Sequence, residues 1–308
     1  MILVGGENLI DFVQDPNSDG LPRYVANPGG SPYNVAMALG RQEVPVGYLT
    51  PISTDSLGDL LAARLIADGV ELLAPRASQP SSLAVVSLQD GTPSYGFYRE
   101  NTAERQISAG SVTAPAATTG LHLGSLALAN GADAVVWEDF FHAQKGMGRF
   151  TSLDPNVRAA FIDDRTGYVA RIERMAAAAD LVKLSDEDLE WLYPHLGQDA
   201  AVAHVHALNP TGLTVLTKGA DGARALSQTG SAEVAAGQAD PFTDTVGAGD
   251  TFAGTLLAQL FHSNRLSADH VAQIDSAGLV DLLTGAARAS AINCSRQGCQ
   301  PPTRADLA

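Results

Sequence analysis

The chain has 308 residues, of which 45% are hydrophobic, so it is long enough to bury a large core in one folded unit, residues 1–308. Its formal net charge of −15 and its lack of any Lys- and Arg-rich segment exclude nucleic acid and anionic membranes as expected partners. No apolar run approaches the roughly 20 residues that span a bilayer, the first residues do not form a leader, and two cysteines are too few for a disulfide framework. We therefore expect a cytoplasmic protein.

Strand-like and helix-like segments alternate along most of the chain. Residues 44–50 form a predicted strand, and residues 56–68 carry leucines at helical spacing. Further strands are predicted at residues 120–126, 150–153, 181–184 and 213–217, and further helices at residues 131–145, 159–179, from 185 onward and 253–261. This alternation predicts a doubly wound α/β fold, with a mostly parallel sheet flanked by helices. Ligands of such sheets bind beyond the carboxyl ends of the strands.

Two segments interrupt this alternation because they contain no crossover helix. Residues 13–26 include the turn signal DPNSDG at 15–20, and residues 83–106 include a β-rich run folded at Asp90 and Gly91. We interpret the two segments as a small β lid over one end of the main sheet. Surface hairpins without a role in binding are the alternative.

Near the N-terminus, residues 27–39 read NPGGSPYNVAMAL and predict the start of a helix. Ser31 is the predicted N-cap, Pro32 fills the first helical position and Gly40 ends the helix. The paired glycines before this helix would let a ligand approach its first turn. The pattern is that of a well-capped helix, with or without a ligand at its N-terminus.

The most informative segment is DTVGAGDTF at residues 244–252, which leads into an amphipathic helix. Glycines where a loop enters a helix let backbone N–H groups approach a phosphate closely. Phosphoryl transfer needs in-line positioning, charge stabilisation and a group that takes the proton of the attacking hydroxyl. Asp250, directly after the last glycine, is placed to be that group. A tight turn in which Asp250 only caps its helix is the alternative.

This segment resembles the C-terminal signature of the ribokinase-like, phosphofructokinase-B type family of carbohydrate kinases. The resemblance implies that Asp250 is the catalytic base and that the amides of Gly247, Ala248 and Gly249 form an anion hole. It also implies that ATP and Mg2+ are cofactors. The segments FYRENTA (97–103), LHLGSL (121–126) and DPNVR (154–158) are similar to the fructokinase branch of that family.

The same resemblance assigns residues to the sugar. Gly29, Gly30 and Asn34 match the family residues that contact sugar hydroxyls, and Asp11, at the end of the first predicted strand, matches the sugar-binding aspartate. A turn residue that introduces the lid is the alternative role for Asp11. We also expect Arg99 and Arg158 to contact the substrate or the transferring phosphate, because a guanidinium binds such oxygens with two donors. A surface ion pair is the alternative for each of them.

For the nucleotide and the cations, TKGADG at 217–222 resembles the nucleotide-binding turn, and RQGCQP at 296–301 resembles the segment that closes the adenine side. We assign Lys183, Ser185, Thr217, Gly219 and Gly222 to the nucleotide. The family's magnesium motif, Asn-x-x-Glu, is replaced by SDED at 185–188, where Asp188 would act on Mg2+ through water. A K+ ion is expected beside Asp244 and the carbonyl of Val246.

The sequence thus predicts an ATP-dependent kinase that transfers the γ-phosphate to a hydroxyl of a small sugar. Fructose is the expected substrate. Kinases of 2-keto-3-deoxygluconate, ribose or a nucleoside remain open, as does a catalytically silent sugar or nucleotide sensor. Aromatic residues make up only 6% of the chain, which weighs against a nucleoside pocket. A homodimer formed through the lid and the identity of the phosphorylated hydroxyl are also left open.

Overall fold

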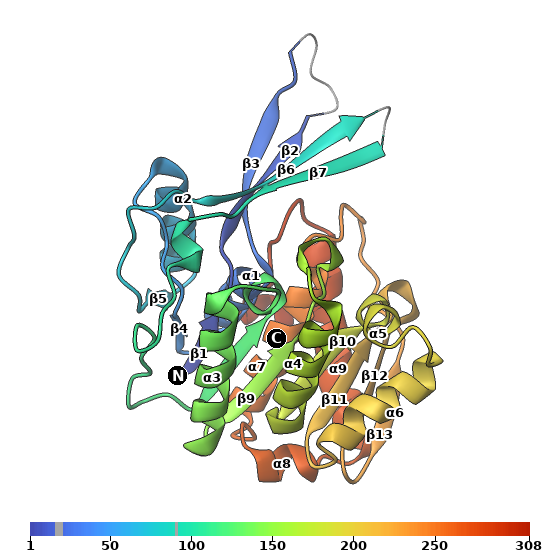
Figure 1. Cartoon of the computed structure of the whole chain (residues 1–308). Helices are drawn as coiled ribbons and strands as arrows, with labels where there is room; N and C mark the ends of the chain where they lie inside the picture. The colour runs from blue at the N-terminus through green and yellow to red at the C-terminus, as the bar shows by residue number, and fades with distance from the viewer. Residues whose placement is uncertain (16–20, 90–91) are drawn as a thin grey trace.

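The structure is a computed structural model that describes residues 1–15, 21–89 and 92–308. Its body is built on a nine-stranded sheet in the order β13-β12-β11-β10-β9-β8-β1-β4-β5 (Figure 1). The strands are β1 (Ile2–Gly5), β4 (Val46–Tyr48), β5 (Val70–Leu72), β8 (Gly120–Gly124), β9 (Phe150–Asp154), β10 (Leu181–Ser185), β11 (Leu213–Thr217), β12 (Ala223–Leu226) and β13 (Ser231–Val234). All neighbouring pairs are parallel except β11–β12 and β12–β13, so the predicted fold class is confirmed.

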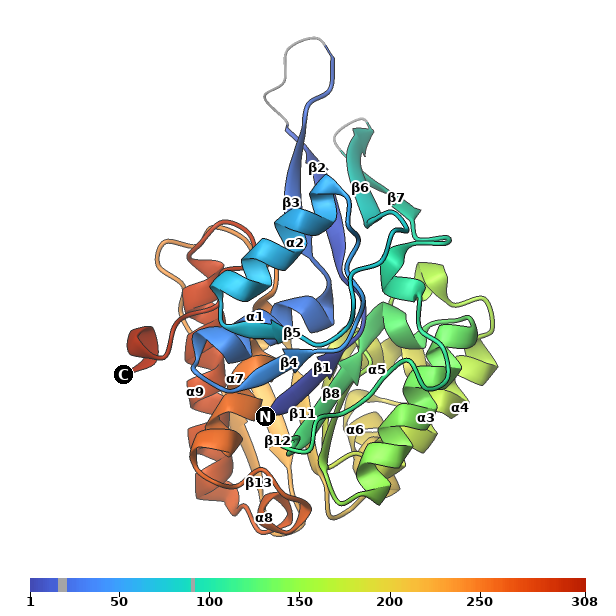
Figure 2. The same ribbon diagram turned by 90° about the vertical axis from the view of Figure 1, so that its left-hand side faces the viewer.

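Helices cover both faces of this sheet (Figure 2). One layer contains α1 (Ser31–Arg41), α2 (Ser56–Ala67), α7 (Ala248–His262), α8 (Ala268–Ala272) and α9 (Ser276–Cys294). The other contains α3 (Ala132–Gly146), α4 (Arg165–Ala178), α5 (Asp186–Leu192) and α6 (Gln198–Leu208). Two apolar cores result, one on each side of the strands. The central strands β1, β8 and β9 are buried on both faces, although β8 and β9 also bury polar side chains such as His122, Thr151 and Asp154.

A second sheet, built largely from the two segments interpreted as a lid and called the lid below, rises above the body (Figures 1 and 2). Its strand order is β3-β2-β6-β7, with β2 (Leu9–Gln14), β3 (Tyr24–Gly29), β6 (Ser82–Gln89) and β7 (Thr92–Tyr98). The turns predicted at residues 16–20 and 90–91 lie outside the described residues. Among the described residues, the lid sheet extends beyond the predicted segments 13–26 and 83–106, because β2 begins at Leu9, β3 continues to Gly29 and β6 begins at Ser82.

The wider lid corrects the predicted place of Asp11. The first core strand already ends at Gly5, and Gly6, at φ +134°, redirects the chain into β2. A side chain at position 6 would also overlap Pro32. Asp11 is therefore a residue of the lid strand β2, paired in register with Asn27 of β3, rather than the end of a core strand.

The start of α1 also differs from the expectation. Gly30 is the N-cap, at φ +114°, and Ser31 is the first helical residue, whose side chain does not cap the helix. Gly40 does not end α1, which continues to Arg41. A side chain at position 40 would overlap the carbonyl of Asp68, so this glycine serves close packing against the turn after α2.

The predicted helix at residues 159–179 is divided. A short 3-10 turn at Ala159–Phe161 comes first, and α4 then begins after Asp164, whose carboxylate accepts from the Gly167 amide. The helices α6, α8 and α9 and the hairpin β12–β13 were not predicted. No helix in the described part of the chain is both long enough and apolar enough to cross a bilayer.

Candidate active site

The glycine-rich loop lies where the chain enters α7. Gly247 is the N-cap of this helix and adopts the left-handed conformation, at φ +72°. A side chain there would also overlap the thiol of Cys299, so both backbone and space require glycine. The Ala248 amide turns back to the carbonyl of Thr245, at 3.1 Å. Among the described residues, the amides of Gly249 and Asp250 are left as the unpaired donors of the first helical turn, where an anion binds well.

Asp250 is buried at this helix start, with 7% of its surface exposed. Its Oδ1 accepts a hydrogen bond from Ser31 Oγ at 2.7 Å, and its Oδ2 accepts one from Asn34 Nδ2 at 2.8 Å. A longer contact of 3.5 Å comes from Asn156 Nδ2, after β9. The carboxylate makes no capping bond to its own helix. The sequence alternative, in which Asp250 is only a helix cap, is therefore wrong.

The expected sugar residues lie around this carboxylate. Asp11 is half-buried, and burial raises its pKa to about 6; the charge of Asp250 adds to this shift and that of Arg158 opposes it. A side chain at Gly29 would overlap the Asp11 carboxylate, which explains the glycine at that position. Asn34 Oδ1 is buried and has no partner among the described residues, so it is available to a ligand hydroxyl.

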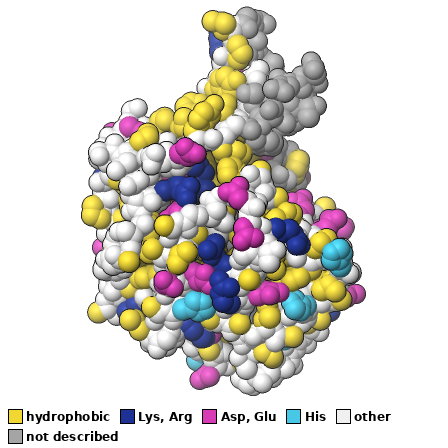
Figure 3. Space-filling model, viewed as in Figure 1, with side chains coloured by type: hydrophobic (Ala, Val, Ile, Leu, Met, Phe, Trp, Pro, Cys, Tyr) yellow, Lys and Arg dark blue, Asp and Glu magenta, His cyan; other side chains and the backbone are white. Residues whose placement is uncertain are grey.

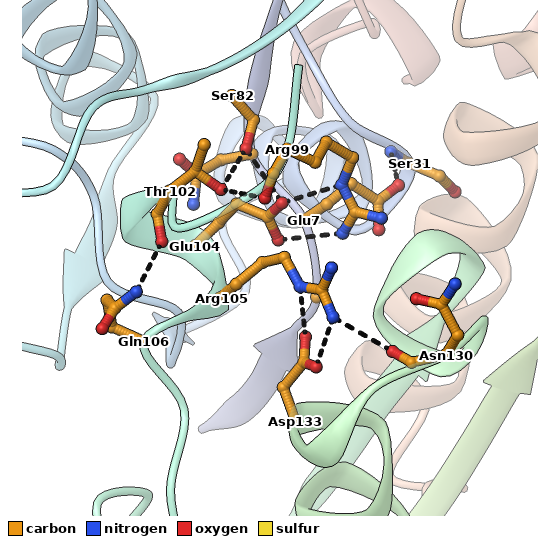
Figure 4. A network of polar contacts seen from close by, with 12 residues as sticks. Glu7, Ser31, Ser82, Arg99, Thr102, Glu104, Arg105, Gln106, Asn130 and Asp133 are labelled. Carbon is orange, nitrogen blue, oxygen red and sulfur yellow. Dashed lines mark hydrogen bonds and ion pairs between the residues drawn. The ribbon is translucent and has the colours of Figure 1, made fainter. Parts of the chain in front are cut away.

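Arg99 is not where the sequence suggested. Its guanidinium is buried and donates twice to Glu104, at 2.8 Å to Oε1 and 3.1 Å to Oε2, beside Glu7 (Figure 4). Ser82, at the start of β6, donates to the same Glu104 carboxylate. Arg99 therefore holds the base of the lid to the body, and the expectation that it contacts substrate is corrected on this ground.

Arg158, by contrast, keeps an exposed guanidinium. It donates to Asn156 Oδ1 at 2.6 Å and to backbone carbonyls of the same loop. Its charge opposes the rise in the pKa of Asp11. The structure thus leaves Arg158 near the other expected sugar residues.

Lys183 lies under the glycine-rich loop. Its Nζ is buried, 2.9 Å from Asp154 Oδ2, and would be 3.2 Å from a β-carbon at Gly249. Burial lowers the pKa of Lys183, but the charges of Asp154, Asp188 and Asp250 and the hydrogen bond to Asp154 together raise it, and the net pKa is raised. Asp154 Oδ1, also buried, has no partner among the described residues. A cation and a free carboxylate oxygen therefore meet beside the helix start.

The expected nucleotide residues share one edge of the sheet. Ser185 ends β10 and pairs in register with Thr217, which ends β11. Gly219 follows at φ +51° with open space around it, as a ligand site requires. Gly222 has a different role: a side chain there would overlap the carbonyl of Val234, so this glycine lets the turn pack on β13.

Asp188 is engaged differently from the expectation. Its Oδ2 accepts from the Ser185 amide at 2.7 Å, and its Oδ1 accepts from the Val157 amide at 2.6 Å. Ser185 Oγ in turn accepts from the Asp188 amide, which completes a capping box for α5. Both carboxylate oxygens hold backbone, so the predicted magnesium role of Asp188 is corrected. In this corner of the described structure, Asp154 Oδ1 is a buried carboxylate oxygen that has no hydrogen-bond partner.

The expected K+ residues lie on the other side of the loop. Asp244 joins two segments, accepting from the Val246 amide at 2.8 Å and from the Gly298 amide at 2.7 Å. The Val246 carbonyl accepts from Asn293 Nδ2 at 2.8 Å. Asn293 is fully buried and was missed from the sequence, where a single asparagine inside a helix gives no signal.

Four other residues of the site were also missed: Glu7, Ser31 as a hydrogen-bond donor, Asp154 and Asn156. The last two stand in the DPNVR segment, where only Arg158 was singled out. Asn156 has φ +38°, and asparagine tolerates this left-handed conformation better than most residues. The asparagine itself, a residue type that tolerates such a turn, was the signal in the sequence that could have pointed to this position.

Comparison with known proteins identifies the family. The model of the pfkB family of carbohydrate kinases matches residues 1–306. A fructokinase of Rhizobium leguminosarum bv. trifolii is 37% identical over 288 residues, covering 91% of this chain and 85% of the relative. A fructokinase of Xylella fastidiosa with bound ATP superposes with a TM-score of 0.87 at 26% identity, covering 99% of this chain and 96% of that one.

A fructokinase double mutant of Vibrio cholerae O395, solved with fructose, ADP and potassium, gives a TM-score of 0.84 at 25% identity, covering 99% of this chain and 96% of that one. These likenesses extend over the body and the lid together. The chain therefore belongs to the pfkB family of carbohydrate kinases and is a phosphotransferase with an alcohol group as acceptor.

Proposed function

We propose that the protein is an ATP-dependent fructokinase in which Asp250 is the catalytic base. The observation that carries this proposal is a buried carboxylate at the mouth of α7, held at 2.7 Å by Ser31 and at 2.8 Å by Asn34, directly beside free helix-start amides. Relatives and structural neighbours named fructokinase supply the substrate.

The reaction is a phosphoryl transfer from ATP to a sugar hydroxyl. Asp250 takes the hydroxyl proton while the oxygen bonds to the γ-phosphorus and the bond to the ADP oxygen breaks. Negative charge spreads over the transferring group. The amides of Gly249 and Asp250 and the ammonium of Lys183 stabilise that charge because they already point at its position.

The sugar is held between the lid and the body. Asp11 accepts hydrogen bonds from sugar hydroxyls through both oxygens, and Asn34 Oδ1 accepts another. The missing side chain of Gly29 leaves room for the Asp11 carboxylate and that of Gly30 for the Glu7 carbonyl. Arg158 closes the side toward the phosphate. Ser185, Thr217 and Gly219 line the edge where the nucleotide lies.

Magnesium fits the residues around Asp154 better than those around Asp188. Asp154 Oδ1 is a buried carboxylate oxygen without a partner among the described residues, and a hard cation that keeps several waters suits such an oxygen. When bound with ATP, Mg2+ neutralises phosphate charge. Asp154→Asn is expected to raise the Mg2+ concentration needed for half-maximal activity, and an unchanged requirement would argue against this assignment.

We also propose K+ beside Asp244 and the Val246 carbonyl, which border the glycine-rich loop. Support comes from the potassium in the Vibrio cholerae neighbour. Activity in K+ should exceed activity in tetramethylammonium at equal ionic strength. Equal rates in both salts would remove K+ from the account. A cytoplasmic location, where ATP is made available, is proposed as well and is tested by cell fractionation.

The substrate is tested by an ADP-release screen with fructose, ribose, 2-keto-3-deoxygluconate and adenosine, using Asp250→Asn as the blank. We expect fructose to give the highest kcat/KM. A higher value with one of the other three would reassign the substrate within the same fold. ADP release from none of them would favour a sugar or nucleotide sensor.

A further inference from the structure

The hydroxyl of Ser31 has an unexpected partner. It belongs to the first residue of α1, one position after the Gly30 N-cap, and it makes no capping bond. It donates instead to Asp250 Oδ1 at 2.7 Å, across 219 residues of sequence. Ser31 is 6% exposed, so the hydroxyl has little access to water that could replace this bond.

The backbone of Ser31 is fixed from the other side by Glu7. The Ser31 amide donates to Glu7 Oε1 at 3.0 Å, and Glu7 is 2% exposed. Figure 4 shows Glu7 among Arg99 and Glu104, at the base of the lid. Burial raises the pKa of Glu7, although the nearby charge of Arg99 opposes this shift. A buried and anchored carboxyl group therefore sets where the Ser31 hydroxyl can point.

We propose that Ser31 is a positioning residue for the phosphoryl transfer, because its hydroxyl holds the Asp250 carboxylate in one orientation and in its ionised form. This inference rests on the proposed role of Asp250 as base. The proton of the sugar hydroxyl moves to Asp250, the sugar oxygen bonds to the γ-phosphorus, and ADP leaves. Ser31 keeps its own proton throughout and touches neither substrate.

The titratable groups that face Asp250 come from several elements. They are Asp11 on β2, Asp154 on β9, Lys183 on β10 and the thiol of Cys299 after α9. None of these changes when a neutral hydroxyl is removed from α1. A hydrogen bond to the ionised form favours that form, so its loss should move the acidic limb of the kcat profile to higher pH. The direction in which the acidic limb moves follows from the loss of this hydrogen bond alone.

The test compares Ser31→Ala with Ser227→Ala under saturating fructose and ATP. Ser227 is equally buried, at 6% exposure, and its hydroxyl donates to the Ile274 carbonyl at the opposite end of the sheet. Ser31→Ala should lower kcat about tenfold, the weight of one hydrogen bond to a charged group, with both KM values within about twofold. The acidic limb of its kcat profile should move up. Ser227→Ala should leave kcat and the limb unchanged.

Ser31→Cys keeps the volume but replaces a strong donor by a weak one, and it carries the same expectation if Ser31→Ala does not fold. Unchanged kcat in a folded Ser31 variant, or a loss that appears only in the KM for fructose, would overturn the proposal. A lower kcat with an unmoved pH limb would do so too. Asp250→Asn is measured in parallel: if it is inactive while Ser31→Ala is normal, only the role of Ser31 fails.

Discussion

Asp11, on the lid strand β2, makes both stability and sugar binding depend on pH. Burial raises its pKa to about 6, against an ordinary value of 3.8, so the folded chain binds this proton more tightly than the unfolded chain does. The stability contributed by the bound proton is therefore present at low pH and is lost as the pH rises through about 6. Sugar binding is favoured at high pH instead, because only the ionised carboxylate accepts hydrogen bonds through both oxygens.

The KM for fructose should therefore rise about tenfold between pH 7 and pH 5, since a pKa near 6 leaves roughly a tenth of Asp11 ionised at the lower pH. Steady-state kinetics across this range measure the change, with the KM for ATP as the internal control. In Asp11→Asn the KM should be higher at pH 7 and nearly independent of pH. A pH dependence that persists in this variant would assign the titration to another group.

At the scale of single residues, the sequence predicted what lies in one contiguous motif. Asp250 and its glycines are adjacent in sequence, so their roles could be predicted. The side chains that donate hydrogen bonds to Asp250 could not be predicted, because Ser31, Asn34 and Asn156 are separated from it by 219, 216 and 94 residues. Only folding brings such side chains together. Asp188 was misassigned because a capping box uses the same residue types as a metal site.

At the scale of elements, the base of the lid depends on a buried ion pair. Arg99 follows β7 and is held by Glu104 of the 3-10 turn Ala103–Arg105, with both side chains buried. Removing the cation would leave Glu104 and the neighbouring Glu7 without compensation in a region of low dielectric. Breaking a buried pair in this way typically costs about 3–5 kcal/mol.

Arg99→Met should accordingly lower the free energy of unfolding by about 3–5 kcal/mol, as measured by urea denaturation. Arg304→Met is the matched control, because Arg304 pairs with Glu43 on the surface and should cost less than about 1 kcal/mol. If the two variants were equally stable, the ion pair would not be what holds the lid base.

The predicted elements were most accurate where a strand was buried on both faces or a helix carried a clear cap. Residues 213–217 and the start of α5 after Ser185 were confirmed on that basis. The boundary at α1 failed because Ser31 was read as a cap, whereas its hydroxyl is used by Asp250. The hydrogen bond from Ser31 to a residue distant in sequence replaces the expected capping bond, and a local sequence pattern cannot predict such a distant partner.

At the scale of the whole molecule, the lid exposes apolar side chains above the body (Figure 3). Leu21, Val25 and Tyr98 are 86%, 54% and 62% exposed. We propose that a second copy of the chain covers this surface, since exposed apolar patches commonly mark interfaces. The order of the nine strands, which brings the binding edge and the lid together, was beyond what a single sequence specifies.

Sedimentation equilibrium tests the proposed dimer. Val25→Lys should shift the protein toward monomer, because a charge replaces apolar surface in the lid. Val135→Lys is the control, since Val135 is 47% exposed on α3, away from the lid. A wild-type protein that is monomeric at high concentration would contradict the dimer without touching the catalytic account.

The most direct measurement is the kcat of Asp250→Asn with fructose and ATP, alongside fructose affinity by calorimetry and the melting temperature. Asparagine preserves the shape of the side chain but cannot take the proton. We expect kcat to fall by about 10²- to 10⁴-fold in a folded protein that still binds fructose. Turnover at the wild-type rate would contradict it, because the proton of the attacking hydroxyl would then leave by another route.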